Sequence, residues 1–378
     1  MHVRRARLSR RAFTLIELLI VIFIIAVVVS ITVPALAKAR RSAKTSATQQ
    51  LLAQVNQASA TFVTDQRRLP GYYSAKDMGA DENGNIVGMS AMENIMLHLA
   101  GGIVATGFGP SASSSAANAI PVAPFNPKRR PPEVVLVDPS KIGVVDGTAK
   151  QNKGYFVPPS KFYVAQTQPA SATAIKQFGS MGKRALPDLV DAYGTPILAW
   201  CEDETATGPI EFDSGNSGPN NFARIGSNQK AAHFYWNSNA AFLRATSLGT
   251  LGKDQVKGAA QEYSIIGDGV PADAREASLT GILGNPSQSS PIDPASLNVN
   301  SILPTAARGK MVLHAASPDG MYLSSLSKGQ SQIKDRVLKY GFNFLNPDGT
   351  TLRTDDAGKS ASIDVVKFFE DSINATGM

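Results

Sequence analysis

Cysteine is almost absent from this chain of 378 residues, in which Cys201 is the single example. One cysteine excludes an intramolecular disulfide, and it neither shows nor excludes an oxidising compartment. Charged residues are also scarce, at 18%, whereas hydrophobic residues make up 43%. This composition predicts a folded chain that is long enough for one large domain or two ordinary ones.

The motifs of common enzyme and zinc sites are missing too. The sequence contains no HExxH, GxSxG, Walker A or paired-cysteine pattern, and its four histidines lie far apart at His2, His98, His233 and His314. We expect His98 and His314 to be ordinary packed or surface residues. The aromatic run from His233 to Trp236 is expected to pack in a core rather than to bind carbohydrate or a partner. These absences favour a protein that is not an enzyme.

No acidic residue lies among the five arginines that precede Phe13, which are Arg4, Arg5, Arg7, Arg10 and Arg11. They account for most of the formal net charge of +7, because 7 − 5 leaves +2 for the rest of the chain. A balance of +2 gives no sign of polyanion binding, so we expect no nucleic-acid partner. We interpret residues 1–12 as a short basic leader.

A long apolar run follows the leader. It covers residues 13–33, and as a helix these 21 residues span about 31 Å, which is enough for the hydrocarbon core of a membrane. Nothing resembling a secretory cleavage site ends the run, so we expect it to stay attached as a transmembrane helix. The leader predicts a cytoplasmic N-terminus with the bulk of the chain outside. The charge asymmetry is modest, because Lys38, Arg40, Arg41 and Lys44 follow the run.

Glu17 is the one carboxylate inside the apolar run. An isolated carboxylate there costs on the order of 3 kcal/mol or more, and such residues usually have a functional partner. Glu17 either snorkels to the nearby interface or pairs with a cation. Cleavage between Ala12 and Phe13 would create an ammonium on Phe13, one helical turn from the Glu17 of a staggered neighbouring subunit. That buried pair would satisfy both charges and set the register.

The segment from Arg10 to Val21, RRAFTLIELLIV, resembles the type IV prepilin processing motif that pilins share with the pseudopilins of type II secretion. The resemblance implies that prepilin peptidase cuts before Phe13 and methylates the new N-terminus. It also implies that Glu17 serves assembly and that Pro34 kinks the helix after the membrane span. Ala12 departs from the usual glycine before the cut, so we expect slower processing. The implied partners are the peptidase, other pilin-like subunits, an inner-membrane platform and membrane lipid.

Beyond residue 33 the pattern predicts an α+β, pilin-like fold. The helix is expected to continue over residues 34–66, with an apolar stripe made by Leu36, Ala43, Ala47, Leu51, Val55, Ala58 and Phe62. Residues 67–378 should form an extracytoplasmic globular domain whose antiparallel sheet covers this stripe. We expect strands at 133–137 and from Ile197, Met311 and Phe342, and a capped helix over 90–99. Residues 101–132 are predicted to form a surface loop.

Three short segments resemble turns and the tail of major pseudopilins. They are the turn from Asp191 to Pro196, the turn from Ser317 to Tyr322, and the tail segment 368–371. Major pseudopilins bind calcium in C-terminal loops, and Asp319 falls in the matching turn, so Asp319 is a calcium candidate. Asp355, Asp356 and Asp364 could be its neighbours, although spacing does not reveal a set of six to eight oxygens. The alternative is a solvated aspartate that stabilises its own turn. No cofactor other than calcium is suggested.

These patterns predict a structural subunit of a type II secretion pseudopilus or a type IV pilus-like filament. The subunit would be held in the inner membrane with its domain in the periplasm, and would polymerise through its N-terminal helix. The alternative is a membrane-anchored enzyme or ligand-binding domain that uses the prepilin anchor for display, because residues 67–378 number 312, far more than a usual pseudopilin domain. The sequence does not indicate which filament system is served, or what the insertions 101–132 and 205–305 contact.

Overall fold

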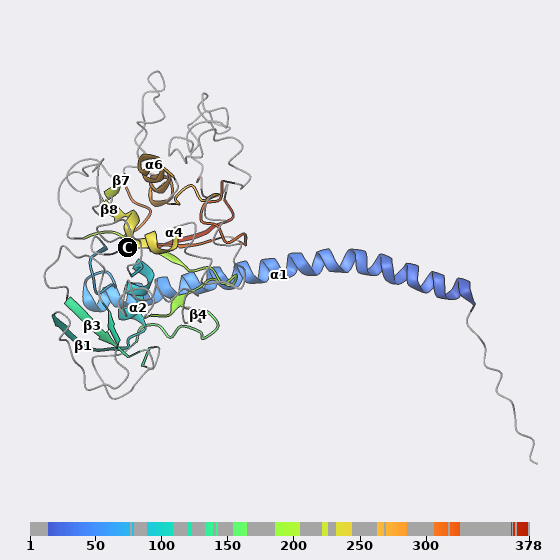
Figure 1. Cartoon of the computed structure of the whole chain (residues 1–378), viewed down its shortest axis with the longest axis horizontal. Helices are drawn as coiled ribbons and strands as arrows, with labels where there is room; N and C mark the ends of the chain where they lie inside the picture. The colour runs from blue at the N-terminus through green and yellow to red at the C-terminus, as the bar shows by residue number, and fades with distance from the viewer. Residues whose placement is uncertain are drawn as a thin grey trace, which may run out of the picture. The chain divides into compact units, whose positions relative to one another are not determined.

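Figure 1 shows the computed structural model of the chain, coloured by residue number. The chain divides into two units, residues 1–46 and residues 47–378, and each is described by itself. The structure describes residues 14–75, 78, 89–108, 120–122, 133–138, 141–142, 154–164, 186–204, 221–225, 232–243, 263–267, 270–285, 306–316, 318–325, 364, 366 and 369–376. Ala12, Phe13, Asp355, Asp356 and the strand expected from Phe342 lie outside these residues.

Helix α1, Leu15–Gln66, contributes to both units. In the first unit its apolar side chains from Leu15 to Leu36 are exposed. The helix is long and apolar enough to cross a membrane, because an 18-residue window of it has a mean hydropathy of 3.1. Pro34 lies inside the helix and lacks the N–H that would bond the carbonyl of Ser30. The expected helix is therefore confirmed, and its end at Gln66 agrees with the predicted limit.

In the second unit, α1 is covered from Thr48 onward. Its buried residues are Thr48, Leu51, Leu52, Val55, Ala58, Ser59 and Phe62. Burial of a Leu, Val or Phe side chain stabilises the fold by about 1.5–3 kcal/mol. The stripe is shorter than expected, because Leu36 is 53% exposed and Ala43 is exposed as well. Both belong to the first unit, so only the part of the stripe within the second unit is covered.

The central sheet of the second unit is antiparallel, with the order β10-β9-β6. Its strands are β6 (Leu198–Cys201), β9 (Met311–Ala315) and β10 (Ser372–Ala375). The strands expected from Ile197 and Met311 are thus confirmed. All five residues of β9 are buried. Because successive side chains point to opposite faces of a sheet, both faces of β9 are covered. Leu313 belongs to the cluster that contains α1, while Val312 belongs to the cluster on the opposite face.

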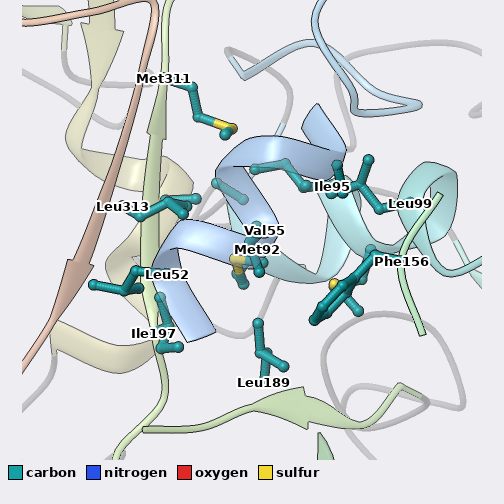
Figure 2. Packing of buried hydrophobic residues seen from close by; sticks show 14 of the residues in the cluster. Leu52, Val55, Met92, Ile95, Leu99, Phe156, Leu189, Ile197, Met311 and Leu313 are labelled. Atoms are coloured by element: carbon teal, nitrogen blue, oxygen red, sulfur yellow. The ribbon is translucent and has the colours of Figure 1, made fainter. Parts of the chain in front are cut away.

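Helix α2, Ala91–Leu99, packs with α1 on one face of this sheet. Figure 2 shows the shared cluster, with Val55 of α1 and Met92 of α2 beside the strand that carries Leu313. The Ser90 side chain accepts the Glu93 N–H, and the Glu93 carboxylate accepts the Ser90 N–H at 2.6 Å. The predicted capping box is therefore confirmed, and it fixes where α2 begins.

Three helical segments contribute to the opposite cluster. They are η3 (Trp236–Asn239), α4 (Ala240–Leu243) and α6 (Ala272–Leu283). Trp236 is 3% exposed and donates from Nε1 to the carbonyl of Ile266 at 2.8 Å. Phe234 is also buried in this cluster. The expectation that the 233–236 run packs in a core is confirmed.

The remaining strands form smaller antiparallel pairings. Strands β1 (Ile103–Phe108), β3 (Glu133–Val137) and β2 (Ile120–Val122) form one sheet in that order. Strands β4 (Tyr163–Val164) and β5 (Asp188–Leu189) form one pair, and β7 (Asn221–Ile225) and β8 (Ala232–Tyr235) form another. The prediction of a loop over 101–132 is wrong for β1 and β2. Both pair with β3, and this partner lies too far along the chain for local composition to reveal it.

The α+β class, with a long N-terminal helix and antiparallel sheets, is confirmed. The proposed limits of the leader, the membrane span and the globular domain stay predictions. Because the chain divides into two units, the contacts in the first unit and those in the sheet-bearing second unit are considered separately below.

Candidate functional site

The first turn of α1 is closed by Thr14 and Glu17. The Thr14 carbonyl accepts the Leu18 N–H, which makes Thr14 the N-cap residue. Glu17 Oε2 accepts both the backbone N–H and the hydroxyl of Thr14 at 2.8 Å, and the Glu17 N–H lies 3.3 Å from Thr14 Oγ1. These reciprocal bonds form a capping box.

This capping box gives Glu17 a local partner that the sequence interpretation did not include. The Thr-x-x-Glu spacing was the signal that could have revealed it. The box orients the carboxylate toward Thr14, at the start of α1. The proposed assembly role of Glu17 stays a prediction.

Hydroxyl groups within the apolar part of α1 bond back to the helix. Ser30 Oγ donates to the carbonyl of Val27 at 2.7 Å, and Thr32 Oγ1 donates to that of Val28 at 3.0 Å. Such internal bonds satisfy polar groups that a membrane would leave without water. They lie just before Pro34, where the proline interrupts the hydrogen-bond ladder. Helix α1 continues through Pro34, the residue at which the resemblance to prepilins implies a kink.

The C-terminal end of α1 is joined to α2 through His98. The Gly71 N–H donates to His98 Nδ1 at 2.9 Å, and Arg68 lies 3.3 Å from His98 Nε2. The His98 ring also lies 5.1 Å from the ring of Phe62. Burial and the nearby Arg68 charge lower the pKa of His98 to about 4. His98 is thus a packed neutral imidazole. The sequence predicted either a packed or a surface histidine, and the structure shows the packed one.

The turn from Asp191 to Pro196 connects α1 to the sheet. Asp191 Oδ1 accepts the N–H groups of Tyr193 and Thr195 at 2.8 and 2.9 Å, and Gly194 has φ +85°. A positive φ there suits glycine, which has no Cβ to clash. The Thr48 hydroxyl of α1 accepts the Ala192 N–H at 3.1 Å. The predicted turn is confirmed, and it holds the start of β6 against α1.

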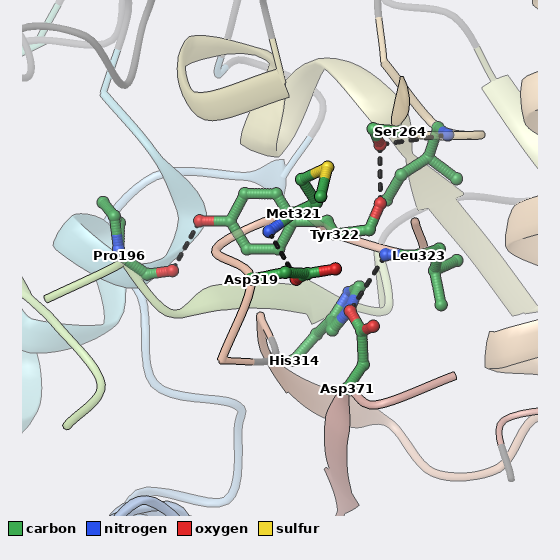
Figure 3. A network of polar contacts seen from close by, with 9 residues as sticks. Pro196, Ser264, His314, Asp319, Met321, Tyr322, Leu323 and Asp371 are labelled. Atoms are coloured by element: carbon green, nitrogen blue, oxygen red, sulfur yellow. Dashed lines mark hydrogen bonds and ion pairs between the residues drawn. The ribbon is translucent and has the colours of Figure 1, made fainter. Parts of the chain in front are cut away.

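A second turn packs against the C-terminal tail through Asp371. Asp371 Oδ2 lies 2.6 Å from His314 Nε2 and accepts the Leu323 N–H at 2.9 Å (Figure 3). Burial raises the pKa of the Asp371 carboxyl, and the bonds from His314 and Leu323 oppose this rise. Tyr322, on the same turn, donates its hydroxyl to the carbonyl of Pro196. Tyr322 thereby connects the two pseudopilin-like turns, and Asp371 ties the tail segment to β9 and to the second turn.

The calcium candidate Asp319 lies in this second turn. Its Oδ1 accepts the Met321 N–H at 3.0 Å, as in an aspartate that stabilises its own turn. Asp364 pairs through both carboxylate oxygens with Arg308. Within the part of the chain that the structure describes, no group of three or more His, Cys, Asp or Glu residues could hold a metal. Because Asp355 and Asp356 lie outside that part, calcium binding through Asp319 stays a prediction.

One polar hollow of about 420 Å³ lies between α1 and the C-terminal tail of the second unit. Its lining residues are Gln49, Leu52, Asp364, Val366, Phe369, Asp371, Ser372, Ile373 and Asn374. Both carboxylates in this lining already have partners, Arg308 for Asp364 and His314 for Asp371. The hollow therefore shows no pair of carboxylates that is arranged for acid–base chemistry.

Comparison with known proteins identifies the N-terminal segment. A family model described as the prokaryotic N-terminal methylation motif matches residues 7–33. No curated protein and no solved structure matches the chain. The matched residues include the predicted cut, Glu17 and the apolar part of α1, so the motif and the helix together indicate membrane anchoring. The chain therefore carries a prepilin-type N-terminal methylation motif, which implies processing by prepilin peptidase.

Proposed function

We propose that this protein is a structural, non-enzymatic subunit of a type II secretion pseudopilus or a type IV pilus-like filament. The observation that carries the proposal is the methylation motif at residues 7–33, which includes the first part of α1. The same helix then supplies buried side chains to the core of an α+β unit. A subunit of this design can polymerise through the exposed apolar part of α1 while the second unit remains folded.

Cleavage before Phe13 provides the chemical step that starts assembly. It creates an ammonium on Phe13, four residues before Glu17. If one subunit is displaced along a neighbour by four residues, or about 6 Å of helix, its Phe13 ammonium lies level with the neighbour's Glu17. The Thr14 bonds hold Glu17 in the first turn, so part of the ordering needed for this pair is already present. Pairing removes two uncompensated charges from the apolar layer.

We propose that the subunit resides in the inner membrane, with its N-terminus in the cytoplasm and its second unit in the periplasm. The five arginines of the leader support this orientation. The turns at Asp191–Pro196 and Ser317–Tyr322 support the type II secretion branch, because their sequences resemble those of major pseudopilins. An inner-membrane assembly platform would be a further partner in either branch.

Expression of the full chain with and without a prepilin peptidase tests the proposal. Mass spectrometry of the assembled material should show an N-terminal methylated Phe13, and electron microscopy should show filaments that depend on the peptidase. Intact Met1 in assembled filaments would overturn the proposed processing. A processed chain that remains monomeric in the membrane would instead favour the alternative of a displayed enzyme or ligand-binding domain.

A further inference from the structure

Four basic residues follow the apolar part of α1 and form what we call the basic collar, defined as Lys38, Arg40, Arg41 and Lys44. All four are exposed and all belong to the first unit. The sequence has no acidic residue between Glu17 and Asp65, so α1 itself supplies no carboxylate within a turn of the collar. The collar is therefore a cluster of four exposed basic residues directly after the apolar part of α1.

The position of the collar along α1 matches the polar layer of a bilayer. Lys38 lies two residues beyond Leu36 and Lys44 lies eight residues beyond it, which corresponds to about 3 Å and 12 Å of helix. The headgroup layer on each side of the hydrocarbon core is about 5–7 Å thick. Side chains on a helix lean toward its N-terminus, and long basic side chains snorkel, so even Lys44 can direct its ammonium back toward this layer.

The collar and the small residues around it occupy different sides of α1. At 3.6 residues per turn, the four basic residues fall within less than half of the helix circumference. The other side carries small residues at helical spacing, which are Ala35, Ala39, Ser42, Ala43 and Ser46. A neighbouring helix can approach closely only over the small side. Contact with another subunit would therefore leave the basic side directed toward lipid.

We propose that the basic collar binds anionic phospholipid headgroups in the leaflet at the C-terminal end of the apolar segment. Clustered basic residues beside a membrane span attract such lipids through charge. The inference rests on the proposed membrane-anchored subunit. Cleavage before Phe13 removes the five leader arginines, so in the processed chain the collar is the main basic flank of the span. The collar would hold the helix at a defined depth before the subunit leaves the membrane.

Spin-label measurements on the reconstituted full chain test this proposal. The chain is placed in an equimolar mixture of phosphatidylcholine and phosphatidylglycerol, and traces of either lipid carry the spin label. All five leader arginines are changed to glutamine in every sample, so that the leader cannot contribute to the selection of anionic lipid. The motionally restricted fraction of each label gives the relative association constant, and we expect several-fold preference for phosphatidylglycerol. The preference should fall when salt rises from about 0.1 M to about 1 M.

Two collar variants provide the comparison. In K38Q/R40Q/R41Q/K44Q the preference should fall to that for phosphatidylcholine, whereas K38R/R40K/R41K/K44R should keep it because the charge is conserved. An unchanged preference in the glutamine variant would overturn the proposal. Crosslinking between chains is measured in the same variants. If the glutamine variant loses crosslinks but keeps its lipid preference, the collar contacts a second copy of the chain, and the proposal is overturned. Processing is read separately, from the N-terminal mass of the chain with its natural leader, so the two failures are distinguishable.

Discussion

Asp371 Oδ2 lies 2.6 Å from His314 Nε2, and this contact joins the residue before β10 to the middle strand of the central sheet. Both side chains are buried, with exposures of 1% and 0%. The same oxygen accepts the Leu323 N–H, so one carboxylate connects β9, the tail and the 318–323 turn. Three segments that are distant in sequence are thus held by a single side chain.

Replacement of Asp371 by alanine should destabilise the second unit. The change leaves the His314 imidazole and the Leu323 N–H buried without their partner, at a cost of about 3 kcal/mol in the free energy of unfolding. Urea unfolding followed by tryptophan emission measures this, because Trp200 and Trp236 are both buried. Glu370→Ala is the matched control, since Glu370 is adjacent but exposed, and it should change the stability by less than about 0.5 kcal/mol. Equal effects of the two changes would contradict the proposed role of Asp371.

His98 should make the stability of the second unit depend on pH. Its pKa is about 4 in the folded chain against 6.5 for an unperturbed histidine, so the unfolded chain binds the proton more readily. The stabilisation is complete above about pH 6.5 and is lost as the pH falls toward 4, by at most about 3 kcal/mol. Protonation at Nδ1 would also remove the acceptor for the Gly71 N–H.

Thermal unfolding of the wild type and of His98→Asn between pH 7 and pH 4 isolates this effect. Asparagine retains a side-chain oxygen as an acceptor but does not titrate. The difference in Tm between the two proteins should therefore shift in favour of the variant as the pH falls. A difference that stays constant across this range would show that His98 does not titrate as described.

Features of this fold that depend on local sequence could be predicted, whereas those that depend on distant pairing could not. The length of α1 follows from its composition, and the start of α2 follows from Ser90 and Glu93. Strand β1 was missed because its partner β3 begins 25 residues after β1 ends. The Asp371–His314 contact joins residues 57 positions apart, so local sequence could not reveal it.

The candidate site shows the same division, with one exception. The methylation motif is a continuous segment, so its residues could be identified directly. The Thr14–Glu17 capping box is equally local, but Glu17 was interpreted only as a carboxylate in an apolar layer. The exposure of Leu36 could not be predicted from the apolar stripe. Hydrophobic spacing does not distinguish a side chain that faces lipid from one that packs in a protein core.

Replacement of Ala12 by glycine should accelerate processing several-fold. Glycine is the usual residue before the cut in the family that this segment resembles, and it lacks the Cβ that must fit beside the scissile bond. Pulse-chase labelling with a prepilin peptidase measures the rate at which the leader is lost. Ala6→Gly is the control within the leader and should leave the rate unchanged. Faster cleavage in both variants would attribute the effect to leader flexibility instead of to the residue at the cut.

Substitutions at Thr14 and Glu17 separate the capping role of Glu17 from its proposed pairing with a neighbour's Phe13 ammonium. Glu17→Gln keeps a side chain that can close the capping box but removes the charge, whereas Thr14→Val removes the N-cap oxygen and keeps the charge. If the charge pair drives assembly, Glu17→Gln should abolish sheared filaments, while Thr14→Val should reduce their yield only modestly through fraying of the first turn, at about 1 kcal/mol. Insertion of Glu17→Gln into the membrane should be undiminished, because a neutral side chain costs less in the apolar layer. Normal filaments from Glu17→Gln would show that the carboxylate serves α1 alone.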